Sequence, residues 1–410
     1  MRSPAVLAWV LACVLSRPAY AGMRGALTDE AAKWCSGARK SQDAIVWLGQ
    51  RKHSSYDATH ANTLNASMAS VREYYPAVRN ADVLVWHEGD MSPRDADALS
   101  GATNVRWCKL KAETGWGARD AKQLAQSRKD ERWHDGYLFM IRWYAATCWR
   151  TLEQLGYGYM MRFDDDSFVL SPIRYDVFHE LRNGGHDYGF RTISRECDRT
   201  FSAFIDGYVQ SRPSARFQLA DDGTVFCEKF PRYCADGAPR HARAKNYQGK
   251  SYCDGPGRLG FYNNWFVTRI GWWTSSASEL TEAFDRSGLI FSDRNNDLIF
   301  QTAALRLLLP REKWRRFAEW TYQHHTVRKG RVVWGGIETG CDDGDAEKTL
   351  RRYAATWYGD VAAPAVRECR VQLTSADEKF RLVKYIAHGA TKGGWLAAPY
   401  CNLNGAVNIW

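Results

Sequence analysis

Long hydrophobic runs are scarce in this 410-residue sequence. The apolar run from Ala5 to Leu15 has eleven residues, whereas a transmembrane helix needs about 20. No later stretch is long enough to span a bilayer, so membrane attachment is expected only through this first segment. Internal repeats and low-complexity tracts are also missing, and a 45% hydrophobic content with 18 tryptophans indicates a packed globule.

Two further absences restrict the partners and the metal chemistry. No Lys/Arg block resembles a nucleic-acid-binding arm, so no nucleic acid partner is expected. The net charge of +10 is spread along the chain, where it either favours an anionic ligand such as a nucleotide diphosphate or only keeps the surface soluble. No cysteines are paired in a Cys-x-x-Cys spacing, so a zinc site is not expected.

The N-terminus has the three parts of an export signal. Arg2 supplies the positive end, the short apolar run follows, and Ala19-Tyr20-Ala21 is a small-x-small cleavage site. Residues 1–21 are therefore predicted to be a signal peptide or, if uncleaved, an anchor. The mature chain is expected in the lumen of the ER or Golgi, or secreted.

Ten cysteines remain after Cys13 leaves with the signal. In an exported protein an even number of cysteines favours disulfides, and the sequence leaves their connectivity open. The ten are Cys35, Cys108, Cys148, Cys197, Cys227, Cys234, Cys253, Cys341, Cys369 and Cys401.

Hydrophobic periodicity in the first half of the chain predicts an α/β fold. A buried strand over 44–48, a helix over 64–75 and a second strand over 83–86 form a βαβ unit, which indicates a mainly parallel sheet. A strong amphipathic helix over 141–155 leads into a strand over 157–163. We expect a mixed, mainly parallel sheet flanked by helices.

The remaining segments are less regular. The polar and basic stretch 107–135 is interpreted as loops, and 175–181 as a short helix followed by a strand over 188–193. An extended aromatic segment covers 260–268, and an apolar helix covers 297–309. Disulfide-bound loops are expected in 221–257. One domain over 40–330 is predicted, followed by a cysteine-containing extension over 331–410 that packs on it.

Three consecutive aspartates follow the predicted strand 157–163. Like charges at this range repel one another unless a cation neutralises them, and a hard divalent ion with oxygen ligands, Mn²⁺ or Mg²⁺, would do so. Asp164 and Asp166 alternate with Asp165 along an extended backbone, so two carboxylates can face one ion. Ligands of open α/β sheets lie beyond the carboxyl ends of strands. The competing interpretation is a solvated acidic turn that caps the next segment through Ser167.

His324 and His325 form a second candidate for metal binding, because neutral imidazole is a competent ligand of Mn²⁺. Adjacent histidines are otherwise typical of a surface. Sequence spacing cannot bring them to the aspartates, so only the fold decides whether they take part.

In these segments the chain resembles glycosyltransferase family 15, the fungal α-1,2-mannosyltransferases, over about 44–325. The family has an Arg-Val-Glu-Pro-Asp turn, and here Arg162-Phe163-Asp164-Asp165-Asp166 stands in its place. Tyr175-Asp176-Val177-Phe178 reproduces a family tetrad. Tyr188-Gly189-Phe190 with Glu196 matches a family run that ends in a sugar-pocket glutamate, and Tyr322 with His324 or His325 resembles the Tyr-His-His that supplies a histidine to the metal.

The resemblance implies a fold, a reaction and a set of site residues. The fold would be the GT-A type of nucleotide-diphospho-sugar transferase, and the reaction transfer of a hexose, mannose from GDP-mannose, to a glycan or glycolipid hydroxyl in the secretory pathway. The implied roles are Mn²⁺ or Mg²⁺ binding by Asp164, Asp166 and His324 or His325, contacts to the nucleotide sugar from Arg51, Arg142 and Asp165, and sugar and acceptor contacts from Glu196, Asp297 and Asn264. Arg150 resembles a further family arginine.

One position departs from the family. The family segment Phe-Trp-Ser-Asn-Phe-Glu corresponds to residues 261–266, so Phe266 replaces a glutamate proposed as nucleophile or transition-state stabiliser. A phenyl ring cannot attack an anomeric carbon. Either the reaction needs no nucleophile there, or another carboxylate takes its place, or activity is lost. The departure also leaves the donor sugar open.

Three rival functions follow. One is an inactive carbohydrate-binding relative of the same fold, and another is a GT-A transferase that uses a different nucleotide sugar. The third is a metal-dependent phosphoesterase, which would require a second set of carboxylates near the acidic turn, where the sequence offers few. Oligomeric state and acceptor are open.

Overall fold

The computed structural model describes residues 31–50, 60–91, 105–127, 135–191, 193–197, 200–212, 217, 243–245, 251–317, 319–324, 327–328, 331–332, 337–338, 366–373, 380–387 and 394–399. The predicted signal segment 1–21 lies outside these residues. Within them, no helix has the length and apolar character needed to cross a membrane.

A seven-stranded sheet forms the centre of the molecule, with the strand order β11-β6-β10-β4-β1-β2-β3. Its strands β1 to β4 run parallel, β10 runs antiparallel between β4 and β6, and β11 pairs in parallel with β6. The expected mixed, mainly parallel sheet is confirmed. The strands are β1 (Asp43–Leu48), β2 (Asp82–His87), β3 (Val105–Lys109), β4 (Tyr159–Phe163), β6 (Tyr188–Phe190), β10 (Trp265–Arg269) and β11 (Trp314–Arg316).

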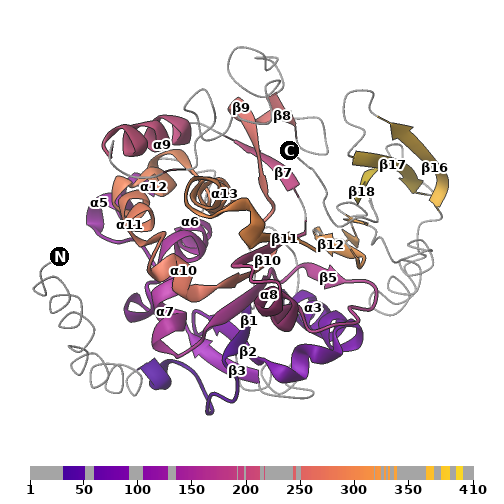
Figure 1. Cartoon of the computed structure of the whole chain (residues 1–410), viewed down its shortest axis with the longest axis horizontal. Coiled ribbons are helices and arrows are strands. Elements are labelled where there is room, and N and C mark those ends of the chain that lie inside the picture. The colour runs from indigo at the N-terminus through magenta and orange to yellow at the C-terminus, as the bar shows by residue number, and fades with distance from the viewer. Residues whose placement is uncertain are drawn as a thin grey trace, which may run out of the picture.

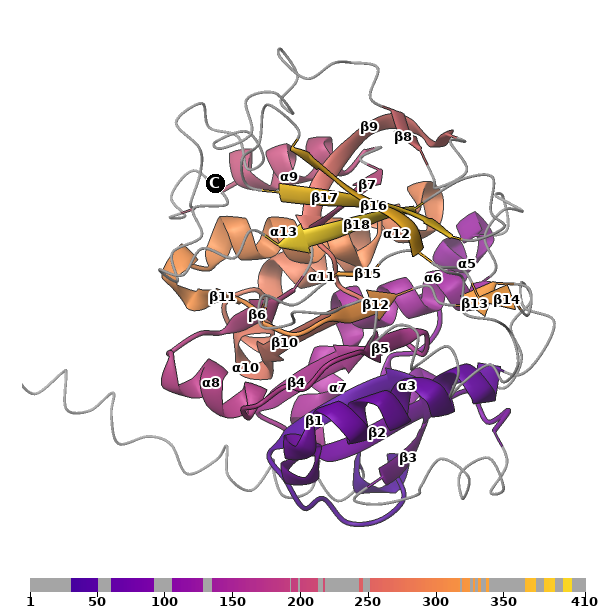
Figure 2. The same ribbon diagram turned by 90° about the vertical axis from the view of Figure 1, so that its right-hand side faces the viewer.

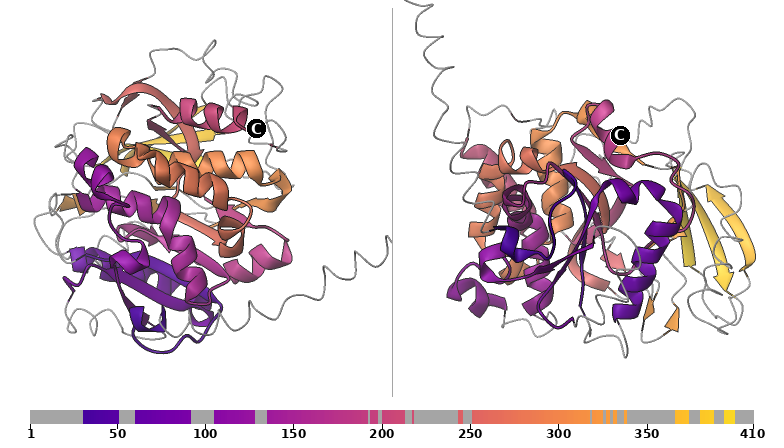
Figure 3. Two further views of the ribbon diagram at one scale, coloured as in Figure 1. Left: turned by 90° about the vertical axis from the view of Figure 1, so that its left-hand side faces the viewer. Right: turned by 90° about the horizontal axis from the view of Figure 1, so that it is seen from below.

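Alternation along the strands divides the core into two layers, one on each face of the sheet. Ala44 and Val46 of β1 face one cluster, and Ile45 and Trp47 face the other, all at most 1% exposed. The first face is covered by α6 (Asp135–Arg142), α7 (Cys148–Gln154), α10 (Ile270–Thr274), α11 (Ser278–Ser287) and α13 (Asp297–Leu308). The second face is covered by α3 (His60–Tyr74) and α8 (Val177–Asn183), as the right panel of Figure 3 shows for α3.

The predicted helix 141–155 is part of a longer helix. A π-helical turn, Trp143–Thr147, joins α6 to α7 without a break in the chain direction, and Gly156 follows in the left-handed region with φ +84°. Such π-turns alter the side-chain register within a helix. The remaining helices of the described chain are α5 (Ala121–Ser127), α9 (Phe201–Gln210) and α12 (Leu289–Asp293), which Figure 1 shows close to α11 and α13. The 3₁₀ turns are Ala32–Trp34, Pro76–Asn80, Ala112–Thr114 and Arg311–Lys313.

Several short sheets surround the central one. The strand β5 (Ser167–Val169) pairs with β12 (Tyr322–His324), which also pairs with β15 (Ile337–Glu338). Figure 2 shows β5 and β12 side by side, next to β4 and β10. Three-stranded sheets are formed by β7 (Ile193–Cys197), β9 (Ser251–Phe261) and β8 (Arg243–Lys245), and by β16 (Val366–Leu373), β17 (Phe380–Ala387) and β18 (Gly394–Pro399), while β13 (Val327–Arg328) pairs with β14 (Arg331–Val332).

The interpretation of 107–135 as loops was wrong at both ends. β3 is the outer strand of the sheet, and its start at Val105 precedes the stretch that looked polar. Its alternating burial reflects an edge strand, whose outer face need not be apolar. At the other end of the stretch, residues 121–127 form the helix α5, and Asp135 is the first residue of α6.

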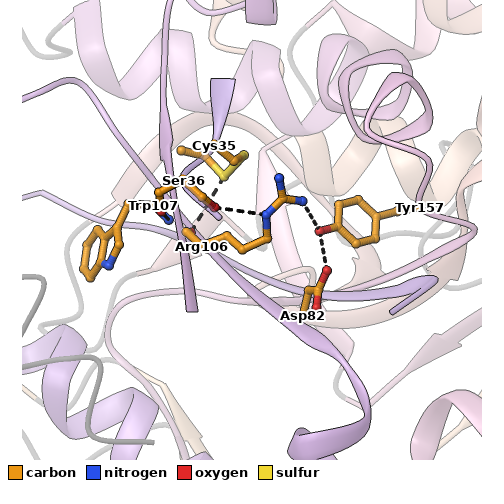
Figure 4. Close-up of a disulfide and its surroundings, with 7 residues drawn as sticks. Cys35, Ser36, Asp82, Arg106, Trp107 and Tyr157 are labelled. Atoms are coloured by element: carbon orange, nitrogen blue, oxygen red, sulfur yellow. Dashed lines mark hydrogen bonds between the residues drawn. A yellow bond between two sulfur atoms is a disulfide. The ribbon is translucent and has the colours of Figure 1, made fainter. Parts of the chain in front are cut away.

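A disulfide attaches the segment before β1 to this edge. Cys35 is bonded to Cys108 of β3, and the backbone N–H of Ser36 donates to the Trp107 carbonyl at 2.8 Å. Nearby, the Arg106 guanidinium donates to the Tyr157 hydroxyl, which donates to Asp82 (Figure 4). The N-terminal segment therefore covers an otherwise open sheet edge.

The expectation that all ten cysteines pair was wrong for Cys148. It lies buried in the first turn of α7 with a free thiol, and its Sγ contacts the Tyr144 carbonyl at 3.9 Å. It faces the helical core layer, where a cysteine behaves as a small apolar side chain. The loop cysteines Cys227, Cys234, Cys341 and Cys401 lie outside the described residues.

Candidate metal centre and donor site

The acidic turn lies where β4 ends, at the carboxyl end of the parallel strands. Directly after Phe163, the backbone N–H of Asp164 donates to the Asn264 carbonyl at 3.1 Å, and the N–H of Ser167 donates to the Asp164 carbonyl at 3.1 Å. These two bonds close the turn and join it to the residue before β10. The expected location of the turn at the strand end is confirmed.

Ser67, a buried serine of α3 on the second face of the sheet, holds the turn through hydrogen bonds. The Ser67 hydroxyl donates to the Ser167 carbonyl at 2.6 Å, and the indole N–H of Trp47 donates to the Ser67 hydroxyl at 3.0 Å. Ser67 is 0% exposed, so these bonds are made away from water. The turn is therefore tied to both β1 and α3, and its backbone has little freedom to shift.

The pairing of β12 with β5 brings His324 to the turn. In this antiparallel pair His324 stands opposite Ser167, one residue beyond Asp166. The Tyr322 hydroxyl donates to the Ser167 hydroxyl at 2.7 Å, although the two residues are 155 positions apart. The histidine predicted from the Tyr-x-His pattern thus meets the predicted aspartates through a strand pairing that the sequence did not reveal.

The imidazole of His324 lies between two carboxylates. Its Nε2 is 3.0 Å from Asp166 Oδ1 and 3.4 Å from Asp164 Oδ2, and its Nδ1 is 2.8 Å from the Tyr262 hydroxyl. His324 and Asp166 are 5% and 7% exposed, whereas Asp164 is partly open. Burial alone would lower the pKa of His324, but attraction and hydrogen bonds from the two carboxylates raise it to about 9.

These three side chains fit a divalent cation. One ligand atom from each of Asp164, Asp166 and His324 lies within 4.8 Å of the other two, and within the described residues they are the one group of this kind. Two carboxylate oxygens and an imidazole nitrogen suit Mn²⁺ and, less closely, Mg²⁺. A cation there would relieve the repulsion between the two aspartates that His324 otherwise relieves by holding a proton.

A buried arginine that the sequence interpretation did not assign to the site lies behind the turn. Arg162 donates from Nε to Asp164 Oδ1 at 2.8 Å and from Nη1 to Asp297 Oδ2 at 2.6 Å. Its guanidinium lies 3.5 Å from the ring centroid of Tyr144. Asn263 donates a further hydrogen bond to Asp297 Oδ2 at 2.7 Å. Arg162 could have been identified from the sequence as a charged residue inside an apolar strand, two positions before Asp164.

Asp297 therefore lies beside the acidic turn, joined to Asp164 through Arg162. It is the first residue of α13, whose N-cap is Asn296, and it is 5% exposed. Burial raises the pKa of Asp297, and the attraction of Arg162 opposes that rise. Asn264 is 2% exposed, and both polar atoms of its side chain lack a hydrogen-bond partner. A buried amide without partners is unusual, and a ligand is one way to satisfy it.

Arg142 has a different environment from the one expected of a nucleotide contact. Its Nε and Nη2 donate to the two carboxylate oxygens of Asp285 at 2.6 and 2.9 Å, and its Nη1 donates to the carbonyls of Gly115 and Gly117. It is 7% exposed, which indicates a role in packing helices together. Arg150 is exposed on α7.

Four other residues were expected at the site. Arg51 and His325 lie outside the described residues, and for Glu196 in β7 only the backbone is described. Asp165 occupies the middle of the turn and is partly exposed, away from the group formed by its two neighbours.

Comparison with known families now decides the class of protein. Residues 117–356, more than half of the chain, match the family model described as glycolipid 2-alpha-mannosyltransferase. The chain belongs to glycosyltransferase family 15. The matched region contains Asp164, Asp166, Asp297 and His324, and it begins after Arg51.

Curated relatives with the same type of name match about half of this chain. Glycolipid 2-alpha-mannosyltransferase 1 of Candida albicans is 27% identical over 46% of this chain and 40% of its own length. The glycolipid 2-alpha-mannosyltransferase of Saccharomyces cerevisiae is 26% identical over 52% of this chain and 44% of its own length. The chain thus spans less than half the length of these two relatives.

Two solved structures share the fold. Core-mannan synthase A from Aspergillus fumigatus, in its Mn/GDP form, has a TM-score of 0.55 at 15% identity, covering 71% of this chain and 76% of that one. The mannosyltransferase Ktr4p from S. cerevisiae, in complex with GDP, has a TM-score of 0.54 at 14% identity, covering 76% and 82%. The expected GT-A-type fold is confirmed.

Phe266, which was expected to stand in the place of a family 15 glutamate, is part of the core. It is 0% exposed, and its ring stacks on Tyr188 at 5.6 Å and contacts Trp149 at 6.2 Å. Across the β10–β4 pair it stands opposite Arg162, the partner of Asp297.

Proposed function

We propose that this chain is a Mn²⁺-dependent transferase that moves mannose from GDP-mannose to a hydroxyl group of a glycan or glycolipid. The observation that carries the proposal is the convergence of Asp164, Asp166 and His324 at the end of β4 in a chain of family 15. The relatives' printed names, and the Mn/GDP form of one structure with this fold, support the choice of sugar, nucleotide and metal.

The cation would be held by the two carboxylates and the imidazole at the mouth of the turn. When bound there, it would offset the charge that builds on the departing diphosphate. The remaining task of the chain is to orient the donor and the acceptor hydroxyl. Partly exposed Asp165 and Arg51 are proposed to contact the nucleotide sugar.

Three further residues are proposed for the sugar and the acceptor. Asp297 is joined to the acidic turn through Arg162. Asn264, whose carbonyl accepts a hydrogen bond from the turn, has a side-chain amide without a hydrogen-bond partner. Glu196 is proposed for the sugar pocket on the family resemblance. Since Phe266 is sealed in the core, no side chain at that position attacks the sugar, and Asp297 is the proposed carboxylate in its neighbourhood.

An inactive carbohydrate-binding relative is the second candidate, because Phe266 removes a family carboxylate. The two differ in turnover. The secreted chain, residues 22–410, is incubated with Mn²⁺ and a panel of nucleotide sugars, and nucleotide release is measured with and without oligomannose acceptors.

Release of GDP from GDP-mannose that increases with acceptor and disappears on chelation supports the transferase. Asp166→Ala should reduce that release at least 100-fold, because it removes a metal ligand. Binding of oligomannose with no release of any nucleotide would instead establish the binding protein. Release from another nucleotide sugar alone would correct the donor.

The secretory location is part of the same proposal. It rests on the export signal in residues 1–21 and on the disulfide between Cys35 and Cys108, which is typical of an oxidising compartment. Sequencing the N-terminus of the chain purified from a eukaryotic secretion host tests it. A mature N-terminus at Gly22 is expected, whereas a retained Met1 in a membrane fraction would indicate an uncleaved anchor.

A further inference from the structure

Arg162 separates the two oxygens of Asp164. Its Nε and Nη2 are both 2.8 Å from Asp164 Oδ1, whereas His324 Nε2 is 3.4 Å from Asp164 Oδ2. Oδ1 thus contacts Arg162, whereas Oδ2 is the oxygen nearer to His324, in the group that these two residues form with Asp166.

This division matters because a carboxylate is otherwise free to turn. The terminal torsion of an aspartate is broad, so an unrestrained side chain can offer either oxygen, or both, to a cation. A charge-assisted hydrogen bond from Nε, together with an ion-pair contact from Nη2 to the same oxygen, restricts that torsion. Asp164 is then fixed as a ligand through a single oxygen, Oδ2.

Arg162 can do this because its own position is fixed on every side. Its side chain is 3% exposed, its Nη1 is held by Asp297, and its guanidinium carbon lies over the ring of Tyr144, 3.5 Å from the centroid. Tyr144 belongs to the π-helical turn between α6 and α7, and its carbonyl accepts a hydrogen bond from Gln301 at 3.1 Å. The guanidinium thus connects three elements, namely β4, the π-turn and α13.

Lysine could not replace it. A compact ammonium group can neutralise one carboxylate, but it has no planar fork to reach Asp164 and Asp297 while stacking on an aromatic ring. The geometry therefore uses the shape of arginine as well as its charge.

We infer that Arg162 is a positioning residue for the metal centre: it holds Asp164 so that Oδ2 alone faces the cation, and it joins the metal turn to Asp297 of α13. The inference rests on the proposed function, because it presumes that the Asp164–Asp166–His324 group binds a cation. It assigns Arg162 no contact with substrate.

Direct metal binding tests this inference without any reaction. Mn²⁺ affinity is measured by isothermal titration calorimetry and by Mn²⁺ electron paramagnetic resonance on the secreted chain and on Arg162→Lys. Loss of a residue that orients a metal ligand typically weakens affinity 10- to 100-fold, and that loss is expected here.

Arg106→Lys is the matched control. Arg106 is also a buried arginine, 4% exposed, but it pairs with Tyr157 at the amino ends of the strands, remote from the turn (Figure 4). It should lower the midpoint of unfolding and leave the Mn²⁺ affinity within twofold of the parent. A loss of affinity as large as that of Arg162→Lys would show a general effect of instability and overturn the inference.

A double-mutant comparison shows whether Arg162 acts through Asp164. In an Asp164→Ala background, Arg162→Lys should cause no further loss of Mn²⁺ affinity, since the ligand that it positions is gone. An equal loss in both backgrounds would contradict the inference. If Arg162→Lys does not fold, Tyr144→Leu removes the ring beneath the guanidinium, and unchanged Mn²⁺ affinity in that variant would overturn it too.

The outcomes also separate the inference from the proposed function. A parent chain that binds no Mn²⁺ refutes the metal site itself. A parent chain that binds Mn²⁺ while Arg162→Lys binds it equally well refutes the positioning role alone.

Discussion

At the scale of residues, the site combines buried carboxylates with the basic side chains that neutralise them. Asp164, Asp166 and Asp297 bring three carboxylates close together, and Arg162 and His324 are the groups that oppose them. Arg162 is permanently charged, whereas His324 can exchange its proton for a metal ion. Metal binding should therefore change both stability and proton uptake.

Removal of one ligand should abolish stabilisation by the metal. A ligand present at 100 times its dissociation constant stabilises the folded state by about 2.7 kcal/mol. We expect Mn²⁺ to raise the unfolding midpoint of the parent chain, and Asp166→Ala to lose that increase. Thermal unfolding with Mn²⁺ or with chelator measures this. Asp293→Ala, a carboxylate outside the group, should keep the increase, and an equal response of all three proteins would contradict the site.

Metal affinity should rise with pH. In the metal-free protein the pKa of His324 is raised from 6.5 to about 9, so below pH 9 the imidazole carries a proton that Mn²⁺ must displace. Affinity should increase by up to about tenfold per pH unit between pH 6.5 and 8, with about one proton released per ion at pH 7.5. Calorimetry in buffers of different ionisation enthalpy measures the release. A constant affinity over that range would show that His324 is not a ligand.

At the scale of elements, short pairings place the ligands. β5 and β12 have three residues each, yet their register places His324 opposite Ser167. The mixed sheet also depends on side chains that pack closely against the backbone of a strand, as they do at Gly189 in β6. A Cβ there would lie 2.4 Å from Phe317 Cε2 and 2.7 Å from Val267 Cγ1.

Gly189→Ala should therefore destabilise the fold. Phe317 is 0% exposed, so its ring has no open space to move into, and overpacking of this kind costs about 1–3 kcal/mol. Denaturant unfolding measures the change. Gly207→Ala in α9, where a Cβ meets nothing within 4 Å, is the control and should be neutral or stabilising by up to about 1 kcal/mol. Equal stability of the two variants would contradict the packing described for β6.

At the scale of the whole molecule, the disulfide joins distant parts of the first half of the chain. Cys35 and Cys108 are 73 positions apart, and the loop they close contains β1, α3 and β2. A long closed loop restricts the unfolded chain more than a short one does. The bond therefore stabilises the fold by restricting the unfolded chain over β1, α3 and β2.

Replacement of both cysteines by serine should lower the free energy of unfolding by about 2–4 kcal/mol. Denaturant unfolding of the double variant, with and without a reducing agent, measures the loss. The reductant should lower the stability of the parent and have no further effect through this bond on the variant. Cys148→Ala is the control, since it removes a thiol that forms no disulfide. A double variant as stable as the parent would contradict the role of the bond.

The extended backbone expected over 164–166 was wrong, because the Ser167 N–H donates to the Asp164 carbonyl and closes a turn there. Local pattern alone determined the alternation of strands and helices and the acidic turn after β4. Such features depend on residues a few positions apart, so periodicity and spacing reveal them. β3 was missed because an edge strand can carry polar residues on its outer face.

Only the tertiary structure decided which distant side chains meet. It placed His324 beside Asp166, paired Arg162 with Asp297 over 135 positions, and engaged Arg142 with Asp285 over 143 positions. A buried charge takes whichever partner the packing of elements brings within reach, because leaving it unpaired is costly. That choice depends on strand register and helix packing, which no stretch of sequence records by itself.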